Sequence, residues 1–245
     1  FFKSLLFFGA GNLYAEAHTT ALDRFGGAAR QMPVTAILFL AGTAAICALP
    51  PLNGFVSEFI IYTGMFRSIA GGEQVLLAAA GVTALALIGG LALFAFTKLY
   101  GIVFLGAPRT HEVAEMHEAD NYRIAAMALP AAGILLVGTL PWTVLPLFTQ
   151  VAATLLPELR STAAALPLQA GLSQITLVAA VLVAVTGLLL AAKRRALRRR
   201  TVAEGPTWGC GFTALNTRMQ YTGESFSEGL ESIVHSFTEE VVEGT

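Results

Sequence analysis

Three ionisable side chains lie within stretches that are otherwise apolar enough to cross a membrane. These are Lys3 in FFKSLLFFGAG, Glu58 in LPPLNGFVSEF and Lys98 in FAFTKLYGIVF. A charge inside a bilayer is expensive, so such residues face the interior of a helix bundle and mark ion or proton pathways. Burial and neighbouring charge both alter proton affinity, so moving one group changes the protonation of another. Lys3 and Glu58 therefore predict proton transfer, with Lys98 as a further candidate.

Each of these positions also has a structural interpretation. Lys3 could be a buried charge that pairs two helices, and Glu58 could cap a helix that starts beside it. Lys98 is explained nearly as well by a long side chain that reaches the membrane surface. His18 is a candidate proton relay, with ordinary loop polarity as its alternative, and Arg67 is interpreted as an interfacial anchor.

The remaining histidines and the cysteines do not form a recognisable metal motif. His111 and His117 lie in THEVAEMHEAD, a segment interpreted as a solvated, amphipathic loop. Cys47 lies in an apolar run and Cys210 in a polar tail, which favours neither a disulfide framework nor a cysteine-rich metal site. We therefore predict no metal, no cofactor and no catalytic residue in this chain.

The composition indicates a membrane protein. Hydrophobic residues make up 55% of the chain and charged residues 13%, and the mean hydropathy is +0.67. Soluble domains rarely have this composition. The formal net charge of −1 gives no reason to expect nucleic acid as a partner. An all-α, polytopic bundle of transmembrane helices in a lipid bilayer is predicted.

The apolar runs divide the chain into three parts. A helix needs about 20 residues to cross the hydrocarbon layer. Residues 1–106 form the first part, 107–192 add further spans, and 193–245 form a polar tail in which a short helix is predicted near 228–242. The predicted membrane helices are 1–15 (partial), 34–69, 75–106, 123–147 and 172–192.

The region 34–69 is too long for one straight span and too short for two, so we predict a single span with a break. Pro50 and Pro51 remove backbone donors, and proline disfavours helical geometry in the residue before it. Asn53 and Gly54 complete the predicted break, where Gly54 lets the chain leave at little steric cost. Irregular backbone at membrane depth is tolerated where protein buries it or where it lines a wet cavity.

The basic cluster KRRALRRR at 193–200 sets the predicted orientation. Lysine and arginine concentrate on the cytoplasmic side of membrane proteins, which places the tail in the cytoplasm. Counting backwards puts 107–122 and 16–33 inside, and 70–74 and 148–171 outside. This alternation requires 34–69 to cross once.

Several motifs resemble a known family. FKSLLFFGAG, LDRFGGAARQMP and LPPLNGFVSEF, in that order, resemble the antiporter-like membrane subunits of respiratory complex I, of multisubunit cation/proton antiporters and of group 4 nickel-iron hydrogenases. The resemblance covers roughly residues 1–105. TWGCGF and RMQYTGESFSEG in the tail resemble the C-terminus of the large membrane subunit of hydrogenase-4 and formate hydrogenlyase.

The resemblance implies the second half of an inverted-repeat, antiporter-like fold with a discontinuous helix. Lys3 matches the family's lysine in the second repeat, and Glu58 matches the acid or lysine after the break. The family's histidine four residues before that lysine would precede Phe1. The first repeat, with its glutamate and central lysine, is also expected to lie outside this sequence.

By this resemblance the chain is a proton-translocating subunit in a prokaryotic plasma membrane. It is itself non-catalytic, within an oxidoreductase complex whose nickel-iron centre, iron-sulfur clusters and flavin belong to partners. The expected partners are other membrane subunits and a soluble hydrogenase-like module. The alternatives are a sodium or potassium/proton antiporter subunit, a complex I subunit and a non-conducting anchor.

Overall fold

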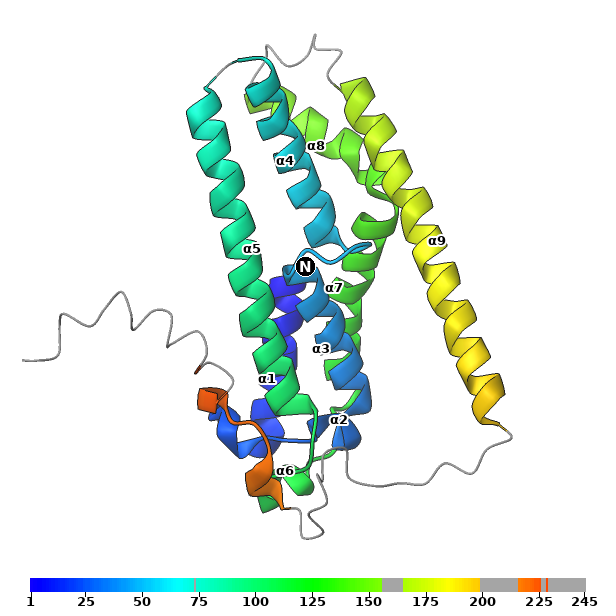
Figure 1. The fold of residues 1–245 in the computed structure, drawn as a ribbon. Coiled ribbons are helices and arrows are strands. Elements are labelled where there is room, and N and C mark those ends of the chain that lie inside the picture. The colour runs from blue at the N-terminus through cyan, green and yellow to red at the C-terminus, as the bar shows by residue number, and fades with distance from the viewer. Residues whose placement is uncertain (73, 156–164, 199–215, 226–227, 229–245) are drawn as a thin grey trace, which may run out of the picture.

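The computed structural model describes residues 1–72, 74–155, 165–198, 216–225 and 228. Every regular element among these residues is a helix, as the apolar composition predicts (Figure 1). Three helices are long and apolar enough to cross a membrane: 75–104, 121–139 and 171–197. The fold of the described part is therefore an all-helical membrane bundle. The expected tail helix near 228–242 lies outside the described residues, apart from Glu228.

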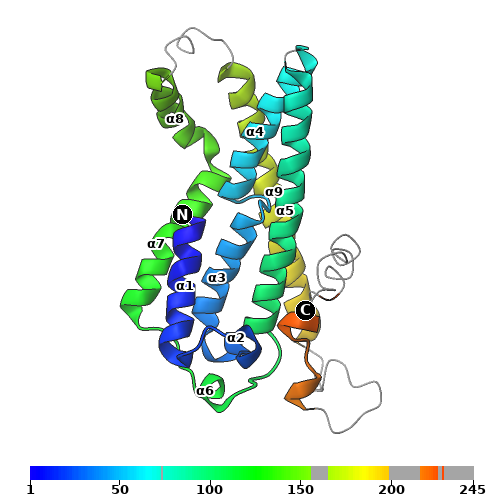
Figure 2. The same ribbon diagram turned by 90° about the vertical axis from the view of Figure 1, so that its left-hand side faces the viewer.

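The helices of the described part follow one another along the chain. Their bounds are α1 Phe2–Ala17, η1 Leu22–Arg24, α2 Ala28–Gln31, α3 Pro33–Ile46, α4 Asn53–Ala70, α5 Val75–Phe104, α6 His111–Ala114, α7 Asn121–Thr139, α8 Pro141–Leu155, α9 Ala165–Leu197 and η3 Thr217–Met219. The ribbon has two ends. We call the end with η1, α2, α6 and η3 the tail end, and the end with the α4–α5 turn and α8 the far end (Figures 1 and 2).

Helices α1, α3 and α7 pack together in the half of the bundle nearer the tail end (Figure 2). Small residues allow these helices to approach closely. A Cβ added to Gly9 would come within 2.5 Å of the Phe39 ring, and one added to Gly42 within 3.1 Å of the Leu6 side chain. Leu5 of α1 also packs against Gly42 and is fully buried. The interface is thus set by glycines that accept large apolar side chains.

A second apolar cluster closes the tail end itself. It includes Met32, Phe104 and Val113, which are 0–1% exposed and come from three separate segments. Val113 belongs to the short helix α6, inside the segment predicted to be a solvated loop. The segment is therefore polar on one side only, and its apolar side covers the ends of the membrane helices.

Helix α5 extends from the far end to the tail end (Figure 1). Its 30 residues correspond to about 45 Å of helix, more than the hydrocarbon layer requires. Helix α9 has 33 residues and lies along the outside of the bundle, where most of its described side chains are exposed. Such exposed apolar surfaces fit contact with lipid or with other membrane helices.

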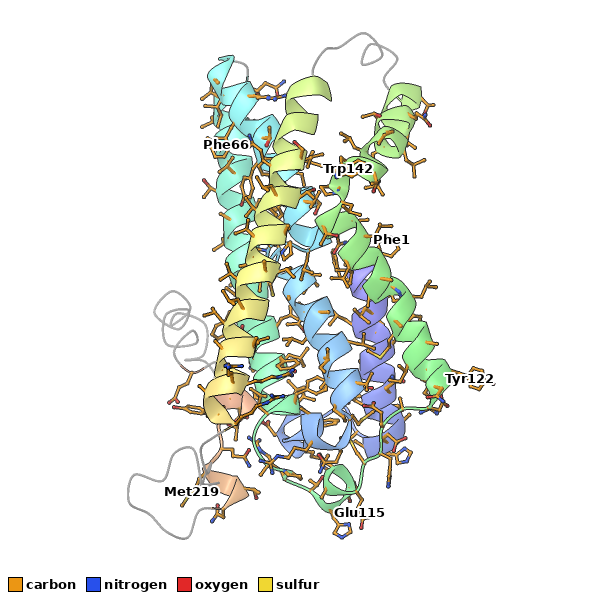
Figure 3. All side chains as sticks on the ribbon, turned by 90° about the vertical axis from the view of Figure 1, so that its right-hand side faces the viewer. Phe1, Phe66, Glu115, Tyr122, Trp142 and Met219 are labelled. Carbon is orange, nitrogen blue, oxygen red and sulfur yellow. The ribbon has the colours of Figure 1, made fainter. Side chains whose placement is uncertain are left out.

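One predicted span differs from the structure. We predicted a single helix over 123–147, whereas α7 ends at Thr139 and α8 begins at Pro141. Leu140 between them has φ −125° and ψ 53°, outside helical geometry. A residue before proline is biased away from helical geometry, so the Leu140–Pro141 step accounts for the bend. Figure 3 shows α8, beginning near Trp142, turning away from the axis of α7.

Candidate functional site: the helix break at the middle of the bundle

The chain leaves helical geometry between α3 and α4, about halfway along the bundle (Figure 1). Helix α3 ends at Ile46, residues 47–52 form the connection, and α4 starts at Asn53 and continues in the same general direction. Pro50 and Pro51 lie within this connection. Asn53 and Gly54, which we predicted to be part of the break, are instead the first two residues of α4.

The connection is held by backbone hydrogen bonds and by an unusual conformation. Ala48 has a positive φ of 51°, which is uncommon for a residue with a side chain. The amide of Leu49 donates to the carbonyl of Ala44 at 3.0 Å, and the amide of Leu52 donates to Leu49 at 3.0 Å. The Ala44 carbonyl near the end of α3 and the Leu49 carbonyl in the connection are thereby satisfied, as buried backbone requires.

Two glycines let other backbone segments touch the break. A Cβ on Gly54 would lie 1.8 Å from the carbonyl oxygen of Ala45, at the end of α3. A Cβ on Gly138 of α7 would lie 2.2 Å from the carbonyl oxygen of Pro51. Gly54 is thus required by close approach to α3, and α7 fixes the connection from a second side.

Glu58 lies on α4, five residues after its start, and is half-buried. Helix α4 has no acidic residue in its first turn and no side-chain cap. The capping interpretation of Glu58 is therefore wrong, because the helix begins earlier than the sequence indicated. Glu58 makes no ion pair or hydrogen bond with another described residue. Its carboxyl group remains available to water or to a residue outside the described part.

Lys3 lies in the first turn of α1, which starts at the level of the break (Figure 3, beside Phe1). Its side chain is exposed, and no ion pair joins it to Glu58 or to any other described carboxylate. Phe1 packs against α7, where a Cβ added to Gly133 would lie 2.8 Å from its ring. The structure thus brings Lys3 and Glu58 to neighbouring levels of the bundle without joining them.

The other predicted candidates lie away from the break. Lys98 lies near the tail end of α5, with its Cε 3.6 Å from a Cβ built on Gly223 of the tail. His18 follows α1 in a left-handed conformation and is exposed. Arg67 is exposed near the far end of α4. Lys98 and His18 are therefore grouped with the tail end, not with Glu58.

Two uncharged polar residues near the helix interfaces, Asn12 and Thr43, were not predicted from the sequence, whereas Asn53 was predicted as part of the break. Asn12 is 5% exposed, and its side-chain amide donates to the sulfur of Met127 at 3.1 Å. Thr43 is 7% exposed, and its hydroxyl has no hydrogen-bond partner among the described residues. The side-chain oxygen of Asn53 is likewise buried without such a partner. Thr43 and Asn53 flank the break and are suited to hydrogen-bonding water there.

Most ion pairs of the described residues involve the segment between α5 and α7. His111 and Glu115 lie 3.3 Å apart and are both exposed, while His117 donates its backbone amide to Glu16 at 3.3 Å. The backbone amide of Glu112 and the Thr110 hydroxyl hydrogen-bond its carboxylate and lower the pKa of Glu112. No group of three metal-binding side chains occurs among residues the structure describes.

This arrangement defines a polytopic membrane protein with a discontinuous helix and a carboxylate shortly after the discontinuity. Residues 1–89 match the family model described as NADH:quinone oxidoreductase/Mrp antiporter, transmembrane region. This match confirms the resemblance drawn from the motifs for that part of the chain.

Curated relatives extend the similarity beyond this region. Hydrogenase-4 component B of Escherichia coli is 37% identical over 224 residues, covering 86% of this chain and 33% of the relative. Formate hydrogenlyase subunit 3 of the same organism is 33% identical, covering 86% of this chain and 34% of the relative. NADH-quinone oxidoreductase subunit M of Rickettsia conorii is 30% identical over 60% of this chain and 28% of its own length. The chain thus spans about a third of the length of these relatives.

Proposed function

We propose that this chain is part of a proton-translocating membrane subunit of a hydrogenase-type redox complex. The observation that carries the proposal is the break between α3 and α4, followed by Glu58, in a segment that matches the antiporter-like family. An interrupted helix places free backbone groups inside the bundle, where they bind water or ions. Water at the break can then exchange protons with the carboxyl group of Glu58.

In this proposal Lys3 and Glu58 are separate stations of one hydrated path, with Lys98 and His18 as further candidates. Their separation in the structure supports relay through water in preference to a direct ion pair. The chain would hold no cofactor of its own. A nickel-iron centre and iron-sulfur clusters would belong to soluble partner subunits, as the names of the two hydrogenase relatives favour.

The proposed location is the plasma membrane of a prokaryote, with the tail end facing the cytoplasm. The described part of the basic cluster, up to Arg198, is at the tail end of α9. The segments at 16–33 and 107–122 share this end, whereas the α4–α5 turn lies at the far end (Figure 1). The orientation predicted from the sequence requires the basic cluster, 16–33 and 107–122 to lie on one side of the membrane and the α4–α5 turn to lie on the other.

The test replaces Glu58 in the full-length subunit within its complex. Glu58→Gln keeps the size and hydrogen-bonding capacity but cannot titrate, so proton translocation per electron should fall while assembly is retained. Glu58→Asp should keep part of the activity. The matched control is Arg67→Gln, at an exposed position on the same helix. An undiminished proton gradient in Glu58→Gln vesicles would favour the membrane-anchor alternative.

A second candidate function is cation/proton exchange, because the matching family model also includes Mrp antiporters. It predicts that activity depends on sodium or potassium at constant pH. A complex I subunit is the other alternative, supported by the similarity to subunit M. Identifying the soluble subunits that co-purify distinguishes this alternative from the hydrogenase proposal. A nickel-containing subunit supports the hydrogenase proposal, and a quinone-reducing module contradicts that proposal.

A further inference from the structure

The tail segment 216–225 lies against the tail end of the bundle (Figure 1, orange; Figure 3, near Met219). It follows a stretch that the structure does not describe, and it includes most of the motif RMQYTGESFSEG. Its partners are the connection after α5 and the 3-10 helix η1, which are separated from it by more than 100 residues. The contacts are specific hydrogen bonds between polar groups.

Gln220 contacts both backbone groups of Ala107. Its Oε1 accepts a hydrogen bond from the Ala107 amide at 2.9 Å, and its Nε2 donates to the Ala107 carbonyl at 3.1 Å. Only a side-chain amide offers a donor and an acceptor in this arrangement. Gly106 makes room for it, since a Cβ there would lie 2.0 Å from the Gln220 oxygen.

Asp23 forms the second contact. Its Oδ1 accepts from the backbone amide of Gly223 at 2.7 Å and lies 3.6 Å from Nη1 of Arg109. Arg109 also donates to the backbone carbonyl of Tyr221, and its side chain is 11% exposed. One arginine thus connects η1 with the tail, in the charge-assisted manner that makes such hydrogen bonds strong.

Lys98 lies beneath the same turn. A Cβ built on Gly223 would be 3.6 Å from Cε of Lys98 and 3.4 Å from Oδ1 of Asp23. Gly223 is itself buried, so the tail turn covers the end of the lysine side chain. A tail that left this position would increase the exposure of Lys98, which is half-buried, and would remove a hydrogen-bond donor from the exposed Asp23.

We propose that residues 105–109 and Asp23 form a binding site for the chain's own tail. The site recognises a turn in which a glutamine, Gln220, and a glycine, Gly223, lie three residues apart. Docking of this turn holds η1 against the end of α5 and screens Lys98 from water. The motif RMQYTGESFSEG, which resembles the C-terminus of the hydrogenase-4 subunit, would thereby stabilise the tail end of the bundle. This inference is independent of proton transfer by Glu58.

The test is amide hydrogen exchange of the full-length subunit in lipid nanodiscs. Gln220→Ala should increase exchange in peptides covering 105–109 and 217–225 by about fivefold or more, as expected for the loss of hydrogen bonds. The matched control is Met219→Ala, because Met219 is the exposed neighbour of Gln220. Equal exchange in the two variants would overturn the proposal.

A second readout reports on Lys98 directly. In a background without Cys47 and Cys210, Lys98→Cys should react slowly with a membrane-impermeant maleimide in inverted vesicles. Adding Gln220→Ala should raise the rate severalfold, and adding Met219→Ala should leave it unchanged. Rapid labelling with the tail sequence intact would show that the turn does not cover this position, and would also overturn the proposal.

Discussion

Glu118 hydrogen-bonds Thr35 across 83 residues of sequence, with Oε1 accepting from the Thr35 hydroxyl at 2.6 Å. The other carboxylate oxygen accepts from the amide of Val34 at 2.6 Å. Helix α3 starts at Pro33 without a cap from its own preceding residues, so Glu118 supplies the acceptor for its free amides. The negative charge also complements the positive end of the helix dipole.

We predict that Glu118→Ala destabilises the protein by about 1–2 kcal/mol, since it removes the cap and leaves the fully buried Thr35 hydroxyl without this acceptor. The melting temperature of the full-length subunit in detergent measures the effect. The matched control is Glu115→Ala in the same segment, where the side chain is 68% exposed. Equal melting temperatures of the two variants would contradict the capping role.

Gly54 and Gly64 on α4 provide a second matched pair. A Cβ at Gly54 would lie 1.8 Å from the Ala45 carbonyl oxygen, whereas one at Gly64 would contact nothing within 4 Å. We predict that Gly54→Ala separates α4 from α3 and strongly lowers the yield of folded subunit. Gly64→Ala should be neutral or stabilising by up to about 1 kcal/mol, because alanine favours helix. Melting temperature and yield are the measurements, and a tolerated Gly54→Ala would refute the close-approach argument.

Local signals account for what the sequence predicted correctly. Pro50 and Pro51 act on their own backbone and on the residue before them, so the interruption within 34–69 can be read from sequence alone. The same signal was present at Pro141 and marks the step from α7 to α8, but the apolar run around it was interpreted as one span. Apolar length alone does not show where a helix bends.

Contacts between distant segments could not be predicted. Gly54 was interpreted as a flexible position, but its role is to admit the Ala45 carbonyl, which depends on how the start of α4 packs against the end of α3. The cap on α3 comes from Glu118, and nothing near Thr35 in the sequence indicates it. Asn12 did carry a local signal, as a polar residue within an apolar run. It was missed because an amide was not counted among the chemically active groups.

The grouping of segments at the two ends predicts a labelling pattern. In a full-length subunit without native cysteines, Ala70→Cys should react with a membrane-impermeant maleimide added to intact cells. Glu115→Cys and Met219→Cys should react only after the membrane is opened, because both positions lie at the tail end (Figure 3). A fully reversed pattern would invert the proposed orientation. Labelling of Glu115→Cys and Met219→Cys from opposite sides would contradict the arrangement of the helices.

The final prediction concerns Thr43, whose buried hydroxyl has no partner among the described residues and lies in the last turn of α3 before the break. Valine has nearly the same shape, so Thr43→Val removes the hydroxyl without leaving a cavity and should change the free energy of unfolding by less than about 1 kcal/mol. If water at the break carries protons as proposed, the same variant should translocate fewer protons per electron. Thr43→Ser should restore translocation.

The control for Thr43 is Thr83→Val on α5, where the hydroxyl hydrogen-bonds the Ala79 carbonyl of its own helix at 3.0 Å. This variant should change neither the melting temperature nor the proton gradient beyond the small effect of helix propensity. A hydroxyl that only fills space predicts a stable Thr43→Val variant with normal translocation. A hydroxyl that hydrogen-bonds water in the path predicts that translocation falls while the melting temperature changes little, because the water chain depends on that group and the packing of α3 does not.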